Sequence, residues 1–269
     1  MKVIDYDRIE EWAPWIDEMI FGAISRDFLK HIAKYQPEYI EDAADILYQY
    51  IDKKDLVNYL ENSLKKFYVR VYHGTRLSQG ELADIKSNGL RPLLLKERKK
   101  NLIEIFKEHS EWEGVKSNLD GVLHRLGPGE EAGRREDGNI YACFSRKGLL
   151  EGASHYLRYG AEVDGHVASM MFDDLAAARR LLSINRTPYL ISFVVDFESA
   201  LSAANPFIFN GEDIPSLLRQ IVESWAYRKY KATFSSESLC DCTAAMFRGP
   251  RPSNELESIE VVSENSIIS

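Results

Sequence analysis

The chain has 269 residues, of which 45% are hydrophobic and 28% charged, a composition typical of a folded protein with room for a full core. No segment approaches the ~18 consecutive apolar residues of a membrane-spanning helix, and the N-terminal MKVIDYDRIEEW lacks the basic-then-apolar pattern of a secretion signal. The net charge of −8 disfavours a nucleic-acid-binding surface. We therefore expect a cytoplasmic protein with no membrane partner.

The cysteines and the basic clusters predict neither a metal site nor a phosphate-binding track. Cys143, Cys240 and Cys242 are too few for a disulfide framework, and no second Cys/His pair stands at a spacing that would complete a metal site with the last two. The clusters KERKK (96–100) and GRRE (133–136) are interpreted as solvated helix and loop faces.

Residues 1–66 are predicted to be helical throughout and to form a bundle of three helices. Apolar residues recur there at steps of three or four, first after Pro37 and again from Leu56 to the start of the next segment. No catalytic pattern is present. We consider this segment as the place where a neutralising or regulatory partner would bind.

After the helical segment the pattern changes to strands that alternate with helices, which predicts an α+β fold. Aromatic and β-branched residues lead into the tripeptide His73-Gly74-Thr75, which is predicted to form a tight turn where the strand ends. The Gly beside the His leaves room for a ligand against the main chain. Ser78 and Glu81 then form a capping box at the start of a helix.

A long polar insertion follows, from residue 95 to residue 138. Its first part has apolar residues at helical spacing, and the stretch LGPGEEAG (126–133) predicts a mobile loop. The insertion is longer than an ordinary connection. We therefore hypothesise that it forms a lid or an acceptor-binding loop.

A second strand is predicted in GNIYACFS, residues 138–145, and it presents Tyr141. Ser145 is expected to cap a single helix that carries Ala153 and Tyr156 on one face and stops at Gly160. The remaining predicted elements are a helix at 173–184, a buried strand at 188–197, a helix at 213–230 capped by Asp213, and a terminal strand at about 257–262.

Three features thus follow one another along the chain: the His-Gly-Thr tripeptide, the strand with Tyr141, and a terminal strand that opens with Glu255, Glu257 and Glu260. This order resembles the ADP-ribosyltransferase superfamily, in particular the His-Tyr-Glu group that includes diphtheria toxin and the poly(ADP-ribose) polymerases. The resemblance covers residues 67–269. It implies a catalytic domain with an ADP-ribosyltransferase-like split β-sheet core, preceded by a helical segment of residues 1–66.

The resemblance also implies roles for individual residues, with NAD as the co-substrate. His73 would bind the ribose next to nicotinamide, and the Gly74 backbone would hold the carboxamide. The ring of Tyr141 would stack on nicotinamide, and Tyr156, with its neighbour Ala153, would close the pocket. Thr75 and Ser145 would complete the binding site.

The carboxylates and one arginine are assigned by the same resemblance. Glu257 would be the catalytic carboxylate and Glu255 its partner on the acceptor side. Glu260 competes for the role, although it lies on the other face of the strand. Arg76 would meet the pyrophosphate, with an exposed surface arginine as the alternative.

The resulting expectation is an enzyme that moves ADP-ribose from NAD to a macromolecular acceptor and releases nicotinamide. A bacterial toxin, effector or defence enzyme is the biology that the resemblance implies. An NAD glycohydrolase, an RNA 2′-phosphotransferase and a catalytically inactive binding module are the alternatives. The phosphotransferase family has a second His where this chain has Tyr141. The acceptor, protein or nucleic acid, stays open.

Overall fold

The computed structural model describes residues 1–20, 26–127, 138–184, 186–204, 216–236 and 244–267. They form two compact units. The first unit comprises Met1–Val71, Cys143–Gly148 and Val194–Ala245, and the second comprises Tyr72–Ala142, Leu149–Phe193 and Met246–Ser269. Helices and strands both contribute, so the predicted α+β class is confirmed.

The described strands form one six-stranded sheet with the order β5-β3-β2-β4-β6, and β1 pairs with β2 off this path. The pairing of β1 with β2 is parallel and that of β4 with β6 is antiparallel, with Tyr189 opposite Val261. The strands are β1 (Val3–Ile4), β2 (Tyr68–Leu77), β3 (Asn139–Cys143), β4 (Thr187–Asp196), β5 (Ala244–Arg248) and β6 (Leu256–Val261). The prediction found β2, β3, β4 and β6, and it missed β1 and β5.

The His-Gly-Thr tripeptide does not form the predicted turn. The strand β2 continues through it to Leu77, flanked on its two sides by β3 and β4. Pairing with neighbours on both sides keeps the backbone extended at Gly74, where the local sequence by itself favours a turn. The prediction of a strand that stops at residue 73 is therefore wrong.

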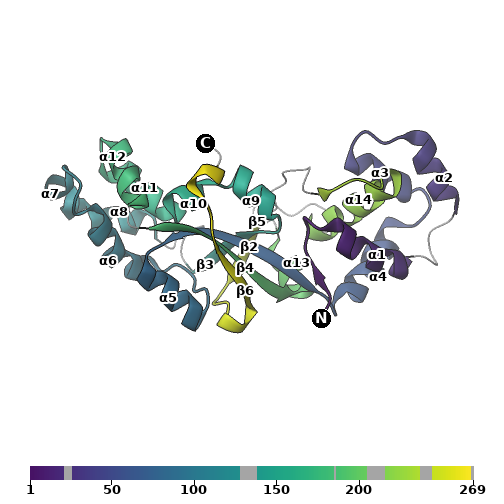
Figure 1. The fold of residues 1–269 in the computed structure, drawn as a ribbon, viewed down its shortest axis with the longest axis horizontal. Helices are drawn as coiled ribbons and strands as arrows, with labels where there is room; N and C mark the ends of the chain where they lie inside the picture. The colour runs from purple at the N-terminus through teal and green to yellow at the C-terminus, as the bar shows by residue number, and fades with distance from the viewer. Residues whose placement is uncertain (21–25, 128–137, 185, 205–215, 237–243, 268–269) are drawn as a thin grey trace. The chain divides into compact units, whose positions relative to one another are not determined.

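The first unit is mainly helical, and the helix α14 packs against the N-terminal helices α1, α2 and α3 (Figure 1). The ring of Phe28 stacks on Trp225 of α14, with 6.4 Å between centroids. The helices of this unit are α1 (Ile9–Ile20), α2 (Arg26–Tyr35), α3 (Ile40–Leu47), α4 (Lys53–Leu64), α13 (Phe197–Ala203) and α14 (Ser216–Tyr230). The described residues of 1–66 thus hold four helices and a short strand where three helices are expected. The predicted cap Asp213 lies outside the described residues.

The second unit contains a helical subdomain with its own apolar core, to which the insertion contributes. The helix α6 contacts α8 and α12, and α11 contacts α8 and α12 (Figure 1). The helices of this unit include α5 (Gln79–Asn88), α6 (Leu95–Phe106), α7 (Trp112–Val115), α8 (Leu119–Arg125), α10 (His155–Tyr159), α11 (Glu162–Met171) and α12 (Leu175–Ser183). Fully buried side chains such as Leu102, Phe106 and Val167 fill the core between them. Most of the insertion is therefore folded helix, and residues 128–137 of the expected loop lie outside the described residues.

The single helix expected after Ser145 is divided in two, α9 (Arg146–Gly152) and α10. Gly152 ends the first helix, and the second begins after Ser154 and stops at Gly160, where φ is +85°. Glycine and serine are poor residues for a helix interior, which accounts for the interruption. The predicted end at Gly160 is confirmed.

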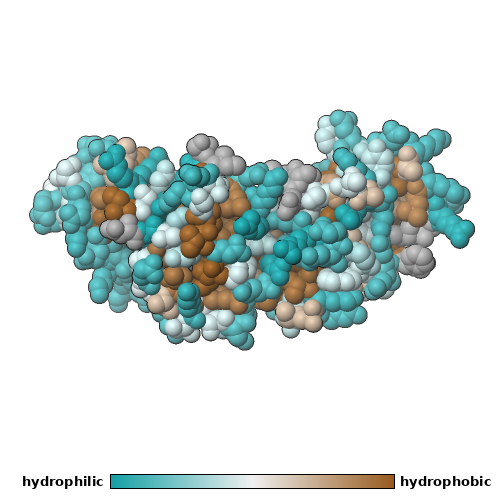
Figure 2. Space-filling model, viewed as in Figure 1, coloured by the Kyte–Doolittle hydropathy of each residue, from teal (hydrophilic) through white to brown (hydrophobic). Residues whose placement is uncertain are grey.

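The face shown in Figure 2 is mostly hydrophilic, with apolar residues exposed in smaller groups. The most exposed large apolar side chain on a strand is Val261 of β6, at 66%. In the part of the chain that the structure describes, no helix has the length and hydropathy needed to cross a bilayer.

Candidate functional site

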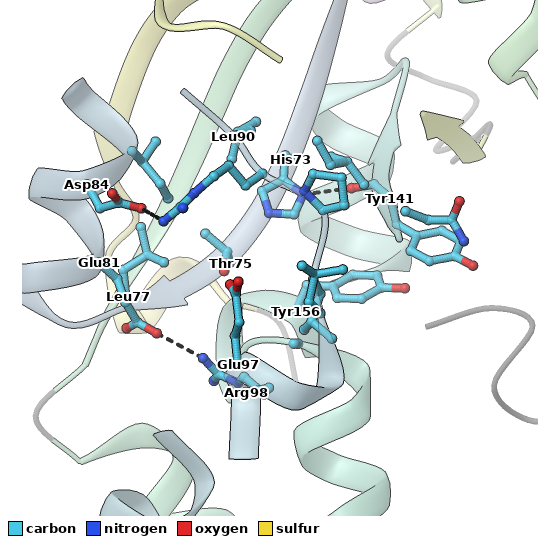
Figure 3. A pocket seen from close by; sticks show the side chains of 18 of the residues that line it. His73, Thr75, Leu77, Glu81, Asp84, Leu90, Glu97, Arg98, Tyr141 and Tyr156 are labelled. Atoms are coloured by element: carbon cyan, nitrogen blue, oxygen red, sulfur yellow. Dashed lines mark hydrogen bonds and ion pairs between the residues drawn. The ribbon is translucent and has the colours of Figure 1, made fainter. Parts of the chain in front are cut away.

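A cavity of about 390 Å³ opens in the second unit, between the two strands β2 and β3 and the helices α5, α6 and α10 (Figure 3). Its size falls within the range of small-molecule sites. The connection between α5 and α6, residues 89–94, forms a further part of the wall. Apolar side chains such as Leu77 and Leu90 alternate there with charged and aromatic ones.

Five of the residues predicted from the sequence line this cavity together. His73, Gly74 and Thr75 come from β2, Tyr141 comes from β3, and Tyr156 comes from α10. The residues of β2 and β3 lie close together because these two strands are neighbours in the sheet. Side chains on alternate residues of a strand share a face, so His73 and Thr75 project together.

The imidazole of His73 is held in one tautomer. Its Nδ1–H donates a hydrogen bond to the carbonyl oxygen of Tyr141, at 2.6 Å, because a carbonyl oxygen can only accept (Figure 3). Burial lowers the pKa of His73, although the Tyr141 carbonyl opposes this shift. The ring is therefore neutral near pH 7, and its Nε2 carries a lone pair that can accept a hydrogen bond.

Gly74 lies between His73 and Thr75 on β2 and is buried. A Cβ at this position would come within 3.0 Å of Leu149 Cδ2. Such an approach is tighter than normal van der Waals contact, so the packing of Leu149 against the strand favours glycine here.

The two tyrosines stand on the same side of the cavity in Figure 3. The hydroxyl of Tyr156 donates to Glu162 Oε2 at 3.2 Å, which ties α10 to the start of α11. Aromatic rings in such a wall offer flat apolar faces for a planar ligand.

An ionic network contributes Glu81, Arg98 and Arg186 to another part of the wall, with Asp164 fully buried behind them. Arg98 of α6 donates to Glu81 at 2.9 Å and binds Asp164 of α11 through two nitrogens. Arg186 bonds both oxygens of Glu81 at 3.0 Å and lies 3.7 Å from Asp164. Burial opposes ionisation of Glu81, but Arg186 and the Ser78 backbone together hold the pKa of Glu81 below its ordinary value. Ser78 and Glu81 also make the predicted capping box. The carboxylate of Glu81, in α5, therefore links the residue after β2 to Arg98 of α6 and to Arg186, which precedes β4.

Arg76 does not line the cavity. Its guanidinium donates to the carbonyl oxygens of Leu157, Arg158 and Arg186 at 3.0–3.3 Å, and it pairs with Glu264. Only 5% of Arg76 is exposed, so the alternative of an exposed surface arginine is wrong. The side chain fastens the end of β2 to neighbouring segments of the second unit.

Ser145 belongs to the first unit and does not line the cavity. Its hydroxyl accepts a hydrogen bond from the Gly148 N–H at 2.8 Å, as expected of the cap of α9. Asp7 contributes to the same helix start by accepting from the Arg146 and Lys147 N–H groups.

The three glutamates near the C-terminus do not line the cavity either. Glu255 lies in a short 3₁₀ turn, with Oε2 3.6 Å from Arg251 Nη1. Glu257 and Glu260 are exposed on β6, whose partner in the sheet is β4. The structure therefore does not bring these carboxylates together with His73, and their catalytic assignment stays a prediction.

The charged wall of the cavity, formed by Glu81, Arg98 and Arg186, is not predicted from the sequence. The KERKK cluster was interpreted as a solvated face, which is wrong for Arg98, because only 9% of that residue is exposed. The available signal was the spacing of Leu95, Arg98 and Leu102, which places the arginine on the buried stripe of the helix. Nothing local marked Arg186 or Asp164 as its neighbours.

Among the described residues, no group of three or more His, Cys, Asp or Glu side chains is arranged to hold a metal ion. Cys240 and Cys242 lie outside those residues, and Cys143 is buried in β3. No family model matches the chain, and neither a curated protein nor a solved structure matches it.

Proposed function

We propose that the protein is an NAD-dependent ADP-ribosyltransferase whose donor site is the cavity of the second unit. One observation carries the proposal: His73 and Tyr141, 68 positions apart in the sequence, line the same cavity beside Gly74, and a hydrogen bond links the two residues. The sequence resemblance assigns NAD binding to these two residues and to the backbone of Gly74.

The chemistry of the lining fits a nicotinamide riboside. The neutral His73 Nε2 would accept a hydrogen bond from a ribose hydroxyl. The Gly74 main chain lies beside the cavity and would offer its peptide groups to a bound carboxamide. The rings of Tyr141 and Tyr156 would flank the planar nicotinamide. The apolar residues of the wall would exclude water from the glycosidic bond.

The reaction would break the bond between the ribose C1′ and the nicotinamide nitrogen through an oxocarbenium-like state, as in other glycosyl transfers. A carboxylate beside the sugar would stabilise that positive charge. When water takes the place of the acceptor, the same site acts as an NAD glycohydrolase. The acceptor, protein or nucleic acid, is not identified by the cavity.

The proposal also covers the domain organisation, a partner and the location of the protein. We take residues 67–269 as a catalytic domain with an ADP-ribosyltransferase-like split sheet, residues 1–66 as the binding place of a neutralising or regulatory partner, and the cytoplasm as the location. A role as toxin, effector or defence enzyme follows from the resemblance.

The test uses the purified full chain and NAD labelled in its nicotinamide ring, with release of label as the readout. We expect His73→Ala to lower kcat/KM about tenfold, because one substrate hydrogen bond contributes about 1–1.5 kcal/mol. Tyr141→Ala should lower it by a similar factor through lost stacking. His124→Ala, an exposed histidine on α8, is the matched control and should leave the rate unchanged. If NAD neither binds to the wild-type protein nor loses nicotinamide, with and without cell lysate as a source of acceptors, the proposal fails.

A further inference from the structure

Among the described residues, four carboxylates line the cavity: Glu81, Asp84, Glu97 and Glu162. Three of them are held by other side chains. Glu81 is bound to Arg98 and Arg186, Asp84 to Asn88 and Arg91, and Glu162 accepts from the Tyr156 hydroxyl. A carboxylate whose oxygens are occupied in this way is a poor base.

Glu97 differs from the other three. Within the described part of the chain its carboxylate has neither a hydrogen bond nor an ion pair, and it is exposed to solvent. In Figure 3 its side chain extends from α6 into the cavity, with the carboxylate directed toward Thr75. It therefore stands on the wall that faces the residues assigned to the donor, with its oxygens available.

The direction of Glu97 is set by its neighbour in the sequence. Arg98 is fastened to Glu81 of α5 and to Asp164 of α11, and this fixes the rotation of α6 about its axis. Consecutive residues of an α-helix point about 100° apart. When Arg98 lies in the network, Glu97 consequently lies at the edge of the cavity, while Leu95 and Leu102 enter the helical core.

We propose that Glu97 is the catalytic carboxylate of this site, supplied by the insertion and not by the terminal strand; the inference rests on the function proposed above. As the C1′–nitrogen bond breaks, its electron pair leaves with neutral nicotinamide, and the anionic carboxylate stabilises the positive charge on the ribose. As the acceptor's oxygen, nitrogen or sulfur forms the new bond to C1′, its proton passes to Glu97.

This assignment gives the first part of the insertion a definite task. The lid or acceptor-binding loop is expected across residues 95–138, and α6 is the described part of this insertion that reaches the cavity. Glu257, the carboxylate that the resemblance selects, is on β6 and outside the lining. The two glutamates are therefore rival candidates that one set of variants can separate.

The experiment compares Glu97→Gln, Glu257→Gln and Glu104→Gln in the full chain. Nicotinamide release gives kcat and KM, calorimetry gives NAD affinity, and circular dichroism checks that each variant is folded. We expect Glu97→Gln to lower kcat at least 100-fold with NAD affinity changed less than threefold, since acid–base groups contribute about 10²- to 10⁴-fold. Glu104 is an exposed residue of the same helix, paired only with Lys107 among described side chains, so its variant should keep wild-type kcat.

The outcomes separate the two proposals. If the wild type releases nicotinamide and Glu97→Gln does so at the same rate, the assignment of Glu97 is overturned while the proposed function stands. A loss in Glu257→Gln without a loss in Glu97→Gln overturns it as well and returns the role to the terminal strand. If the wild type neither binds NAD nor releases nicotinamide, the proposed function fails, and the assignment of Glu97 falls with it.

Discussion

Replacing Asp164 with alanine should destabilise the second unit strongly, although Asp164 does not line the cavity. The carboxylate is fully buried, accepts a 2.8 Å hydrogen bond from Arg98 Nε and lies 3.7 Å from Arg186 Nη1. Without it, two buried guanidinium groups lose an opposite charge at the same place.

The size of the effect follows from those contacts. Two unit charges about 4 Å apart attract by about 4 kcal/mol at an effective dielectric constant of about 20, and the cost of burying Asp164 offsets part of this. Removing one partner of a buried pair typically costs about 3–5 kcal/mol. Arg98 and Arg186 keep Glu81, at 2.9 and 3.0 Å, so we expect the lower end, about 3 kcal/mol.

Equilibrium unfolding in urea, followed by circular dichroism, measures this free energy. The matched control is Glu104→Ala, which breaks an exposed ion pair with Lys107 on α6 and should not change the midpoint measurably. A double variant, Arg98→Met with Asp164→Leu, should recover part of the loss, because it removes a charge together with its partner. An Asp164→Ala protein as stable as the wild type would refute the network as a structural element.

Three further predictions concern β2 and the start of α5. Burial lowers the pKa of His73 from its ordinary 6.5, so the stability that neutral His73 contributes is fully present above pH 6.5 and should decline as the pH falls through the lowered pKa. The proposed NAD binding should decline over the same range, and calorimetry on His73→Ala should show no such step. Gly74→Ala should lower the melting temperature by crowding Leu149, at a cost of about 1–3 kcal/mol, whereas Gly80→Ala, which meets no atom within 4 Å, should not lower it. Ser78→Ala removes the cap of α5 and should cost about 1 kcal/mol in urea unfolding.

Features that depend on neighbours in the sequence could be predicted from the sequence. The capping box of Ser78 and Glu81 needs only residues three positions apart, and it is present as predicted. The same holds for the stop at Gly160, where positive φ favours glycine. The two-residue period of β3 likewise predicted Tyr141 as a side chain on a strand, whereas His73 was expected in a turn at the end of β2.

Features that depend on distant partners were decided by the tertiary structure. The turn expected at Gly74 is an extended strand because β3 and β4 pair on either side of it. The two-residue strand β1 carries too little local pattern to be recognised, and it exists because Val3 and Ile4 find Tyr68 and Val69 in register.

In the candidate site, too, some features follow from the local sequence and others only from the tertiary structure. The sequence by itself determined that Tyr141 stands on a strand and that another strand leads into His73 and Gly74, since alternation along a strand is a local property. Only the folded chain decided that Glu81 and Asp164 hold Arg98 and that Glu97 consequently faces the cavity. An ion pair between residues 66 positions apart leaves no periodic trace in the sequence, so the charged wall and the position of Glu97 beside it depend on how the helices pack together.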